Sequence, residues 1–396
     1  MPSKLLCPFC FEPFKDTDTH WRCESSSCAS PSDGLPGEPD ENYTQYLQEM
    51  NPEQKIGPQR LGHTFELPPS ASLLGKLKPR GKIAYCDWCG KRSAKRACPK
   101  CHNSLPHSID DIDNYVVAII GGPGVGKSHF IATLVDQLRN AVGNSFDMSL
   151  MPLSDETTKR YKRDFYEPLY LQHRTLDKSQ VADRAPLMYR LKRISGRGQK
   201  SVMLVFFDNA GETFGSDDQL GVFARYVRYA NAVVLLADPL QMPAIRSQME
   251  SKGVTLPPAG LEPTEILTRV IRQFEQFEVV KPGKQIPVPI CVAFTKADLL
   301  RDHEVLPPGN AVFGARRQEG QFDADTARQI HDEVQSMLAS WNGMELDGLL
   351  RHHFKTYSYS AISAIGSAPE SGRVPSVTPF RVEDPFLWSL SVFKFL

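Results

Sequence analysis

The chain has 396 residues, 41% of them hydrophobic, and its 46 basic and 46 acidic side chains cancel to a formal net charge of zero. This length can form one large α/β domain of about 280 residues and a smaller N-terminal region. The zero balance excludes a function that depends on bulk attraction to a polyanion, so a charged surface must be local. Apolar runs stay below the ~18 residues that span a bilayer, and residues 1–4 lead to cysteines rather than to a signal-peptide core. We therefore expect a soluble, cytoplasmic protein.

Eight of the nine cysteines form four close pairs near the N-terminus. In chain order they are Cys7 and Cys10, Cys23 and Cys28, Cys86 and Cys89, and Cys98 and Cys101. The first two pairs have the spacing C-x2-C-x12-C-x4-C and the last two C-x2-C-x8-C-x2-C, and each set can present four thiolates tetrahedrally to Zn²⁺. The sequence therefore predicts two zinc ribbons, one over residues 1–30 and one over residues 81–108.

Other interpretations of these cysteines stay open. Disulfides are the main alternative, and an intracellular location disfavours them. His20 or His102 can replace a cysteine ligand, and iron–sulfur ligation is chemically possible. The ninth cysteine, Cys291, falls in a predicted core strand, where we expect an inert packed thiol.

Residues 31–80 hold eight prolines and many small polar residues, which indicates a linker or an extended insert. From Lys76 to Lys100 the chain carries nine Lys or Arg against one acidic residue, Asp87. With Tyr85 and Trp88 available for stacking, this basic second ribbon is a candidate contact for nucleic acid or for an acidic protein surface. A solvated ribbon surface is the alternative.

Residues 121–128 read Gly-Gly-Pro-Gly-Val-Gly-Lys-Ser and fit the phosphate-binding pattern G-x-x-x-x-G-K-[ST]. The apolar run 115–120 before them predicts a buried strand, and apolar residues at helical spacing follow over 131–138. In such a strand–loop–helix unit the loop N–H groups face the phosphates, the lysine reaches the β- and γ-phosphates, and the serine ligates Mg²⁺. The residues predicted for these contacts are Gly121, Gly122, Gly124, Val125, Gly126, Lys127, Ser128 and His129.

A first switch should supply a threonine before the strand predicted over 187–194. Thr175 is the best placed candidate. Thr157 and Thr158 compete with it, but they follow Ser154, which is typical of a helix start, so we expect both in the first turn of that helix.

A second switch follows the strand predicted over 201–207. There Asp208 would hold Mg²⁺ through water, and the Gly211 N–H would approach the γ-phosphate. Glu212 completes this motif.

Two further buried strands, 232–237 and 288–294, come next, and the second runs into Thr295-Lys296-Ala297-Asp298. The Asp298 carboxylate can accept two hydrogen bonds from guanine, a pattern that adenine does not offer, while the stem of Lys296 packs on the base. The position at the carboxyl end of a strand strengthens this guanine assignment.

These elements, in this order, make residues 114–396 resemble the P-loop GTPases of the Ras and translation-factor (TRAFAC) class. The resemblance implies an α/β fold with a mostly parallel sheet flanked by helices, here a GTPase domain over 109–396, which binds GTP or GDP with Mg²⁺. It also implies that Ser360 and Ala361, after a strand over 355–359, form the last base-contacting element.

Two departures from that class matter. Thr295 stands where Asn is usual, and Glu212 stands where Ras-like enzymes have a glutamine that orients water. A carboxylate near the γ-phosphate is electrostatically unfavourable, so we expect slow intrinsic hydrolysis, with Lys127, Glu212 and Thr175 as the catalytic candidates. Possible charge stabilisers are Arg163, Arg174, Arg184, Arg225 and Arg228.

The layout is also similar to bacterial double-GTPase proteins, in which a GTPase domain with a D-x-A-G-E switch follows N-terminal zinc ribbons. That resemblance implies a switch whose ribbons dock a partner protein, in a conflict or defence setting. Two alternatives stay open: a nucleotide-binding adaptor or scaffold that does not hydrolyse, and an ATPase of the same fold.

Proline, glycine and charge are frequent over 239–260 and 301–323, which we expect to be long loops beside the nucleotide. The apolar tail 385–395 predicts a last helix that packs on the sheet. A membrane-surface or partner role for this tail is the alternative.

Overall fold

The computed structural model describes most of the chain. The described residues are 4–31, 33–51, 54–68, 81–176, 185–195, 198–207, 221–276, 280–281, 283–306, 309–314 and 320–396. The chain divides into two compact units: a first one of residues 1–114 with 219–226, and a second one of residues 115–218 with 227–396.

Among its described residues, the first unit consists of short antiparallel strands, helix α1 and most of helix α5 (Gly221–Arg228). Its elements are β1 (Lys4–Leu6), β2 (Pro13–Lys15), the 3-10 turn η1 (Asp16–Asp18), β3 (His20–Arg22), α1 (Glu41–Met50), β4 (Thr64–Phe65), β5 (Ala84–Tyr85), β6 (Arg92–Ser93) and β7 (Arg96–Ala97). The stretch predicted as a linker thus contains α1, whose N-cap Asp40 accepts from the Tyr43 N–H at 2.9 Å. In the three-stranded sheet β4-β3-β7, Trp21 pairs with Arg96 and is fully buried.

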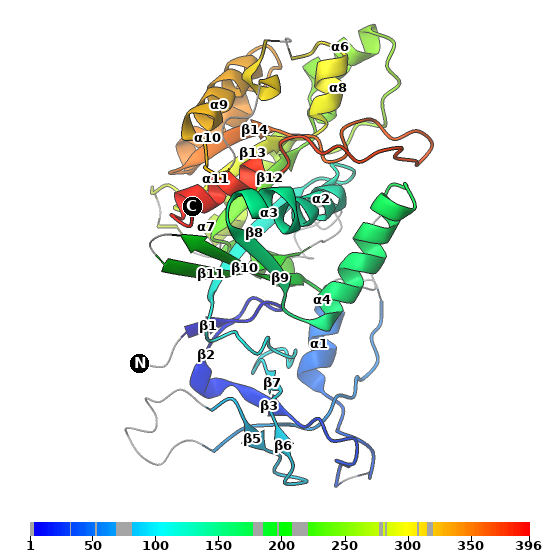
Figure 1. Cartoon of the computed structure of the whole chain (residues 1–396), viewed down its shortest axis with the longest axis vertical. Helices are drawn as coiled ribbons and strands as arrows, with labels where there is room; N and C mark the ends of the chain where they lie inside the picture. The colour runs from blue at the N-terminus through cyan, green and yellow to red at the C-terminus, as the bar shows by residue number, and fades with distance from the viewer. Residues whose placement is uncertain are drawn as a thin grey trace. The chain divides into compact units, whose positions relative to one another are not determined.

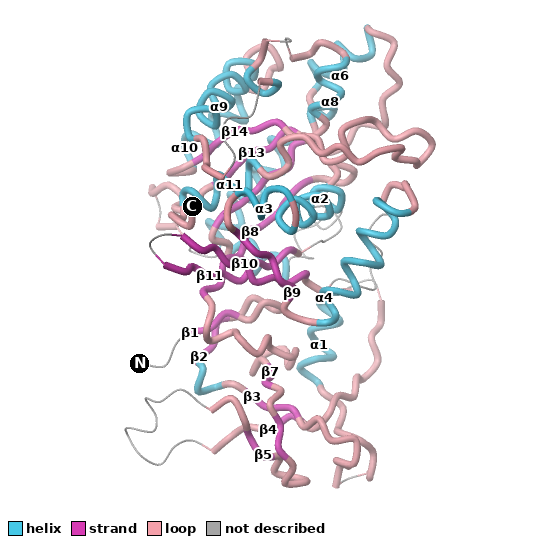
Figure 2. Tube along the Cα trace, viewed as in Figure 1, coloured by secondary structure: helices cyan, strands magenta, loops and turns pink. Residues whose placement is uncertain are grey.

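The second unit is built on one seven-stranded sheet with the order β14-β13-β12-β8-β11-β10-β9. Its strands are β8 (Asp113–Gly121), β9 (Met148–Pro152), β10 (Leu187–Ser195), β11 (Gly198–Phe206), β12 (Ala232–Ala237), β13 (Ile290–Phe294) and β14 (Tyr357–Ala361). β8, β12, β13 and β14 pair in parallel, whereas β9, β10 and β11 form an antiparallel portion. Figure 2 marks the strands in magenta. The predicted mostly parallel α/β fold is confirmed. β12 is buried along its whole length, as expected for a central strand.

Helices connect these strands (Figure 1). They are α2 (Lys127–Arg139), α3 (Ala141–Ser145), α4 (Asp155–Arg160), the π-helical η3 (Tyr161–Leu171), α5 (Gly221–Arg228), η6 (Pro239–Gln241), α6 (Pro243–Ser251), α7 (Pro263–Gln276), α8 (Ala297–Asp302), η7 (Ala311–Phe313), α9 (Ala324–Leu338), α10 (Met344–His353) and α11 (Asp384–Val392). The predicted last helix is confirmed as α11, which packs on β12, β13 and β14. The expected loop over 239–260 is wrong in part, since α6 lies within it.

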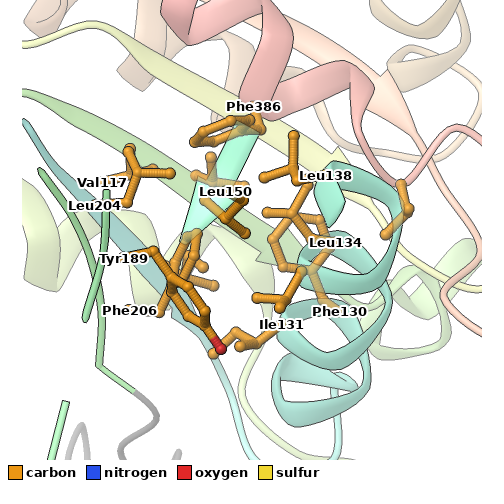
Figure 3. Packing of buried hydrophobic residues seen from close by; sticks show 14 of the residues in the cluster. Val117, Phe130, Ile131, Leu134, Leu138, Leu150, Tyr189, Leu204, Phe206 and Phe386 are labelled. Carbon is orange, nitrogen blue, oxygen red and sulfur yellow. The ribbon is translucent and has the colours of Figure 1, made fainter. Parts of the chain in front are cut away.

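The main core of the second unit lies between the sheet and helices α2 and α11 (Figure 3). Val117 from β8 and Leu204 and Phe206 from β11 point to this side, as the period of two along a strand requires. Leu134 from α2 and Phe386 from α11 close the cluster. Burial of this apolar surface fixes α2, and therefore the loop that precedes it, at the carboxyl end of β8. Among the described residues, no helix is both long and apolar enough to cross a membrane.

Candidate nucleotide and zinc sites

The phosphate-loop motif lies between β8 and α2, and its backbone requires glycine at three positions. A Cβ on Gly121 would lie 2.6 Å from Val125 Cγ1 and 3.1 Å from the Leu236 carbonyl oxygen. Gly124 and Gly126 have φ of +73° and +95°, in the left-handed region that side chains disfavour. The glycines of the motif are therefore demanded by the conformation of the loop.

Helix α2 begins directly at Lys127, with Gly126 as its N-cap. The Phe130 N–H donates to the Gly126 carbonyl at 2.9 Å and closes the first turn. The lysine side chain is buried, with 8% of its surface exposed. A helix N-terminus preceded by a glycine loop concentrates backbone N–H dipoles, and this arrangement suits an anion.

The Thr-Lys-Ala-Asp motif follows β13 and is tied to both neighbouring strands. The Thr295 N–H donates to the Ala237 carbonyl, at the end of β12, at 2.9 Å. The Ala297 N–H donates to the Ile362 carbonyl, just after β14, at 3.0 Å. Asp298 lies in the first turn of α8 and is only 6% exposed. The motif is held rigidly at the carboxyl edge of the sheet.

Sequence reasoning missed Asp238, which follows β12 and is 6% exposed. Its carboxylate accepts from the Leu240 N–H at 3.0 Å and from Lys296 Nζ at 2.6 Å. Lys296 itself has a φ of +58°, so its backbone is in the left-handed region. An acidic residue directly after a buried strand was the available signal.

Ser360 and Ala361 end β14, in register with Ala293 and Phe294 of β13. The Ser360 hydroxyl lies 3.6 Å from Cys291 Sγ, inside the sheet layer. Burial raises the pKa of the Cys291 thiol to about 12, which agrees with the expected inert thiol. Beyond the strand end, a cavity of about 340 Å³ is lined by Asp298, Arg301, Phe313, Ser363, Gly366, Thr378, Pro379 and Phe380.

Thr175, the first-switch candidate, contacts the segment that follows β14. Both its N–H and its hydroxyl donate to the Gly372 carbonyl, at 2.9 and 3.3 Å. The next residue, Leu176, donates its N–H to His129 Nε2 at 3.1 Å. The residue after Thr175 is thus hydrogen-bonded to the residue after Ser128, although the two lie 47 positions apart in the sequence. Thr157 and Thr158 lie in the first turn of α4, as predicted.

Other predicted residues are outside this arrangement. Asp208, Gly211, Glu212 and Arg184 lie outside the described residues. Arg163 pairs with its neighbour Asp164, and Arg225 makes its contacts within the first unit.

The cysteines form two clusters of four, and the predicted grouping in chain order is wrong. One cluster is Cys7, Cys10, Cys98 and Cys101, and the other is Cys23, Cys28, Cys86 and Cys89. Each cluster takes one pair from each cysteine-rich segment, because β3 pairs with β7 and brings the segments together. The two segments therefore build one interleaved module.

The geometry of both clusters fits zinc. Four sulfur–sulfur distances, two in each cluster, lie between 3.6 and 3.8 Å. A tetrahedron with Zn–S bonds of about 2.3 Å has edges of about 3.8 Å. N–H groups of Lys100 and Asn103 approach Cys98 Sγ and Cys101 Sγ at 3.3 Å, which favours thiolates. In the second cluster a backbone hydrogen bond from Lys91 lowers the pKa of Cys89 to about 7, whereas burial raises the pKa of Cys23 and of Cys28.

None of the nine cysteines forms a disulfide, and the eight paired ones complete both clusters. His20 and His102 are not needed as ligands. Instead, His102 Nδ1 lies 2.8 Å from Asp40 Oδ1, and its Nε2 lies 3.1 Å from His20 Nδ1. His63, Cys86 and Asp87 form a third group within metal-binding distance, but Cys86 already belongs to a four-cysteine cluster.

A glycine loop at the head of a mostly parallel sheet, with a Thr-Lys-x-Asp motif at the same edge, defines a P-loop nucleotide-binding protein. Residues 115–349 match the family Double-GTPase 2. This match spans more than half of the chain, and the chain therefore belongs to that family of P-loop GTPases.

The chain is 29% identical over 322 residues to the putative ESX-1 scaffolding and assembly protein SaeC of Mycolicibacterium smegmatis, covering 76% of this chain and 81% of that protein. Similar solved structures include a putative nucleolar GTP-binding protein 1 from Plasmodium falciparum, with 11% identity and a TM-score of 0.26 over 72% of this chain and 88% of that one. A Sulfolobus solfataricus GTP-binding protein in complex with GDP has 13% identity and a TM-score of 0.28, over 72% and 55% of the two chains. The family assignment does not depend on these distant structures.

Proposed function

We propose that this protein is a GTP-binding switch whose intrinsic GTP hydrolysis is slow. One observation supports this most directly. β12 runs parallel to both β8 and β13, so the loop after β8 and the motif after β13 stand at the same edge of the sheet. Lys127 at the start of α2 and Asp298 at the start of α8 can then serve the phosphates and the base of a single nucleotide.

In this proposal each part of the nucleotide has its own residues. The backbone N–H groups of residues 121, 122 and 124–129, with the Lys127 side chain, would bind the phosphates, and the Asp298 carboxylate would accept hydrogen bonds from guanine. Thr295, Lys296, Ser360 and Ala361 would line the base. Ser128 and Asp208 would hold Mg²⁺, which neutralises phosphate charge when it is bound.

Slow hydrolysis is proposed from Glu212, which stands where a water-orienting glutamine is usual. Its carboxylate would be repelled by the γ-phosphate. Gly211 and Thr175 would contact the γ-phosphate, and a partner protein that binds the segments around them would accelerate GTP hydrolysis.

A second candidate function is a nucleotide-binding scaffold without productive hydrolysis. The name of the M. smegmatis relative, a putative scaffolding and assembly protein, favours it. The two cysteine clusters, as zinc sites, would then stabilise a docking module for a protein partner. The conflict or defence setting stays a prediction.

A nucleic-acid contact through the basic segment is supported only in part. Tyr85 is 68% exposed and pairs with Arg92 across β5 and β6. Trp88, however, already stacks on His63, with ring centroids 3.5 Å apart. The Lys91 ammonium also has partners, the hydroxyls of Ser25 and Ser27.

The test is a titration of the zinc-loaded full chain with GTP, GDP and ATP, in which bound nucleotide and released phosphate are followed together. GTP preference with slow phosphate release supports the switch, and tight GTP binding without release supports the scaffold. Asp298→Asn should abolish the preference for guanine, with Asp302→Asn on the exposed side of α8 as the matched control. A preference for ATP would overturn the guanine assignment.

A further inference from the structure

Helix α5, which follows the second-switch sequence, is bound to the first cysteine cluster. The first unit includes residues 219–226 of the chain. Within it, Arg225 Nε donates to the carbonyl oxygen of Cys10, itself a predicted zinc ligand, at 2.8 Å. Arg225 Nη2 also donates to Glu49 Oε2 of α1 at 2.7 Å, and Arg225 Nε lies 3.6 Å from Glu12 Oε1. One arginine thus joins α5 to the cysteine turn and to α1.

An aromatic contact also joins α5 to the cysteine turn. The rings of Phe11 and Tyr226 have centroids 5.0 Å apart, and both side chains are fully buried. Phe11 has a φ of +56°, uncommon for a residue with a bulky side chain. Its N–H donates to the Cys7 carbonyl at 3.0 Å, which closes the turn between the two cysteines. The turn that holds the sulfur atoms therefore also packs Phe11 against α5.

Charge complements this geometry. Four thiolates around Zn²⁺ carry a net charge of −2, and Glu12 and Glu49 add two more negative groups beside Cys10. The Arg225 guanidinium contacts the Cys10 carbonyl and the carboxylates of Glu12 and Glu49, and its side chain is 21% exposed. Removal of Arg225 would leave the Cys10 carbonyl and two carboxylates without this donor, which weakens the fixed geometry of the turn.

We infer that the release of zinc from Cys7, Cys10, Cys98 and Cys101 depends on the bound nucleotide through α5, with Arg225 as the coupling residue. The inference rests on the proposed function, because the sequence between β11 and α5 contains the proposed second switch. α5 begins directly after that sequence in the chain and carries Arg225 and Tyr226, which contact the cysteine turn.

The experiment uses the full chain loaded with zinc. Zinc transfer to a chromophoric chelator is followed in the nucleotide-free, GDP-bound and GTPγS-bound states, and nucleotide affinity is measured on the same samples. We expect the release rate of one of the two ions to differ at least threefold between GDP and GTPγS. The ion at Cys23, Cys28, Cys86 and Cys89 serves as the internal reference, with the same rate in every state.

Arg225→Ala should abolish the difference between the nucleotide states and accelerate release of the first ion, while GTP affinity stays within about twofold. The matched control is Arg228→Ala on the same helix, whose guanidinium lies 5.2 Å from the centroid of the Tyr229 ring; it should retain the wild-type difference. Glu49→Gln, which keeps Arg225 and weakens its ion pair, should give an intermediate difference and guards against unfolding of the alanine variant.

Two failures are distinguishable. If GTPγS and GDP bind but both ions leave at equal rates in every state, the coupling is wrong and the proposed function stands. If neither nucleotide binds the zinc-loaded chain, the proposed function fails and the coupling fails with it.

Discussion

Lys296 donates from its ammonium group to Asp238 Oδ2 at 2.6 Å, an ion pair that links the turn after β13 to the end of β12. Asp238 is almost fully buried, whereas the Lys296 side chain is 27% exposed. The same carboxylate also caps η6 by accepting from the Leu240 N–H. The pair therefore fixes the side chain of Lys296, which in the proposed function packs against the base. The backbone of Lys296 is constrained as well, by its positive φ.

Asp238→Asn tests this role. The amide can still accept from Leu240, but it no longer attracts the Lys296 ammonium. Loss of a charge-assisted hydrogen bond of about 1–2 kcal/mol corresponds to a 5- to 30-fold weaker affinity for GTP. Calorimetric titration with GTP measures the change. Asp302→Asn, an exposed change on α8, should leave the affinity unaltered, and an unaltered affinity in Asp238→Asn would show that the pair has no part in binding.

Gly121→Ala tests the steric demand of the phosphate loop. The added methyl would meet Val125 Cγ1 at 2.6 Å and the Leu236 backbone at 3.1 Å. Since the backbone atom cannot move aside cheaply, we expect a loss of about 1–3 kcal/mol in the free energy of unfolding, together with loss of nucleotide binding. Urea denaturation and nucleotide titration report the two effects.

The control for that change is the adjacent Gly122→Ala. Its methyl would lie 3.1 Å from Ile266 Cδ1, the tip of a flexible side chain that can shift. It should lose less stability than Gly121→Ala. Equal losses in both variants would contradict the argument from the rigid neighbour.

The grouping of the cysteines gives a prediction in zinc stoichiometry. Cys10→Ser and Cys98→Ser should each remove the same ion, because both sulfur atoms belong to one cluster. The double variant Cys10→Ser, Cys98→Ser should then retain about one zinc per chain, whereas Cys10→Ser, Cys23→Ser should retain none. Metal analysis after gel filtration decides this. If Cys10→Ser, Cys98→Ser retains no zinc and Cys10→Ser, Cys23→Ser retains one, each ion is instead held by four cysteines that are consecutive in the chain.

The sequence predicts the motifs that neighbouring residues form and misses the contacts between residues that are far apart in the chain. The phosphate loop was predictable because strand, glycines and helix follow one another within residues 115–138. The cysteine clusters were not, because pairing of His20 with Ala97 decides which pairs meet. Similarly, Thr175 meets Gly372 across 197 positions of the chain.

Composition misled the prediction at α6. Its segment was expected to be a loop because of its prolines, but Pro243 stands in the first turn, where a missing N–H costs nothing. Asp238 was missed for a different reason. Its partner Lys296 had already been assigned to the base, and only the geometry shows that the ammonium also has an acidic neighbour in the protein.

The last prediction concerns pH and His331 of α9, whose Nδ1 accepts from the Tyr359 N–H of β14 at 3.2 Å. Burial lowers the pKa of His331 below its usual value of 6.5, against the opposing charges of Asp332 and Asp347. The unfolded chain therefore binds this proton more readily than the folded chain does. The stability that neutral His331 contributes is present above about pH 6.5 and is lost as the pH falls toward the lowered pKa of the folded state.

His331→Asn keeps an acceptor for the Tyr359 N–H and removes the titration. We expect the wild type to lose more of its urea midpoint between pH 7.5 and pH 5.5 than this variant does. His352→Asn, at an exposed position near the end of α10, should follow the wild type. If wild type and His331→Asn decline in parallel, the contact between α9 and β14 does not depend on a neutral imidazole, and the acid sensitivity of the sheet edge must come from other groups.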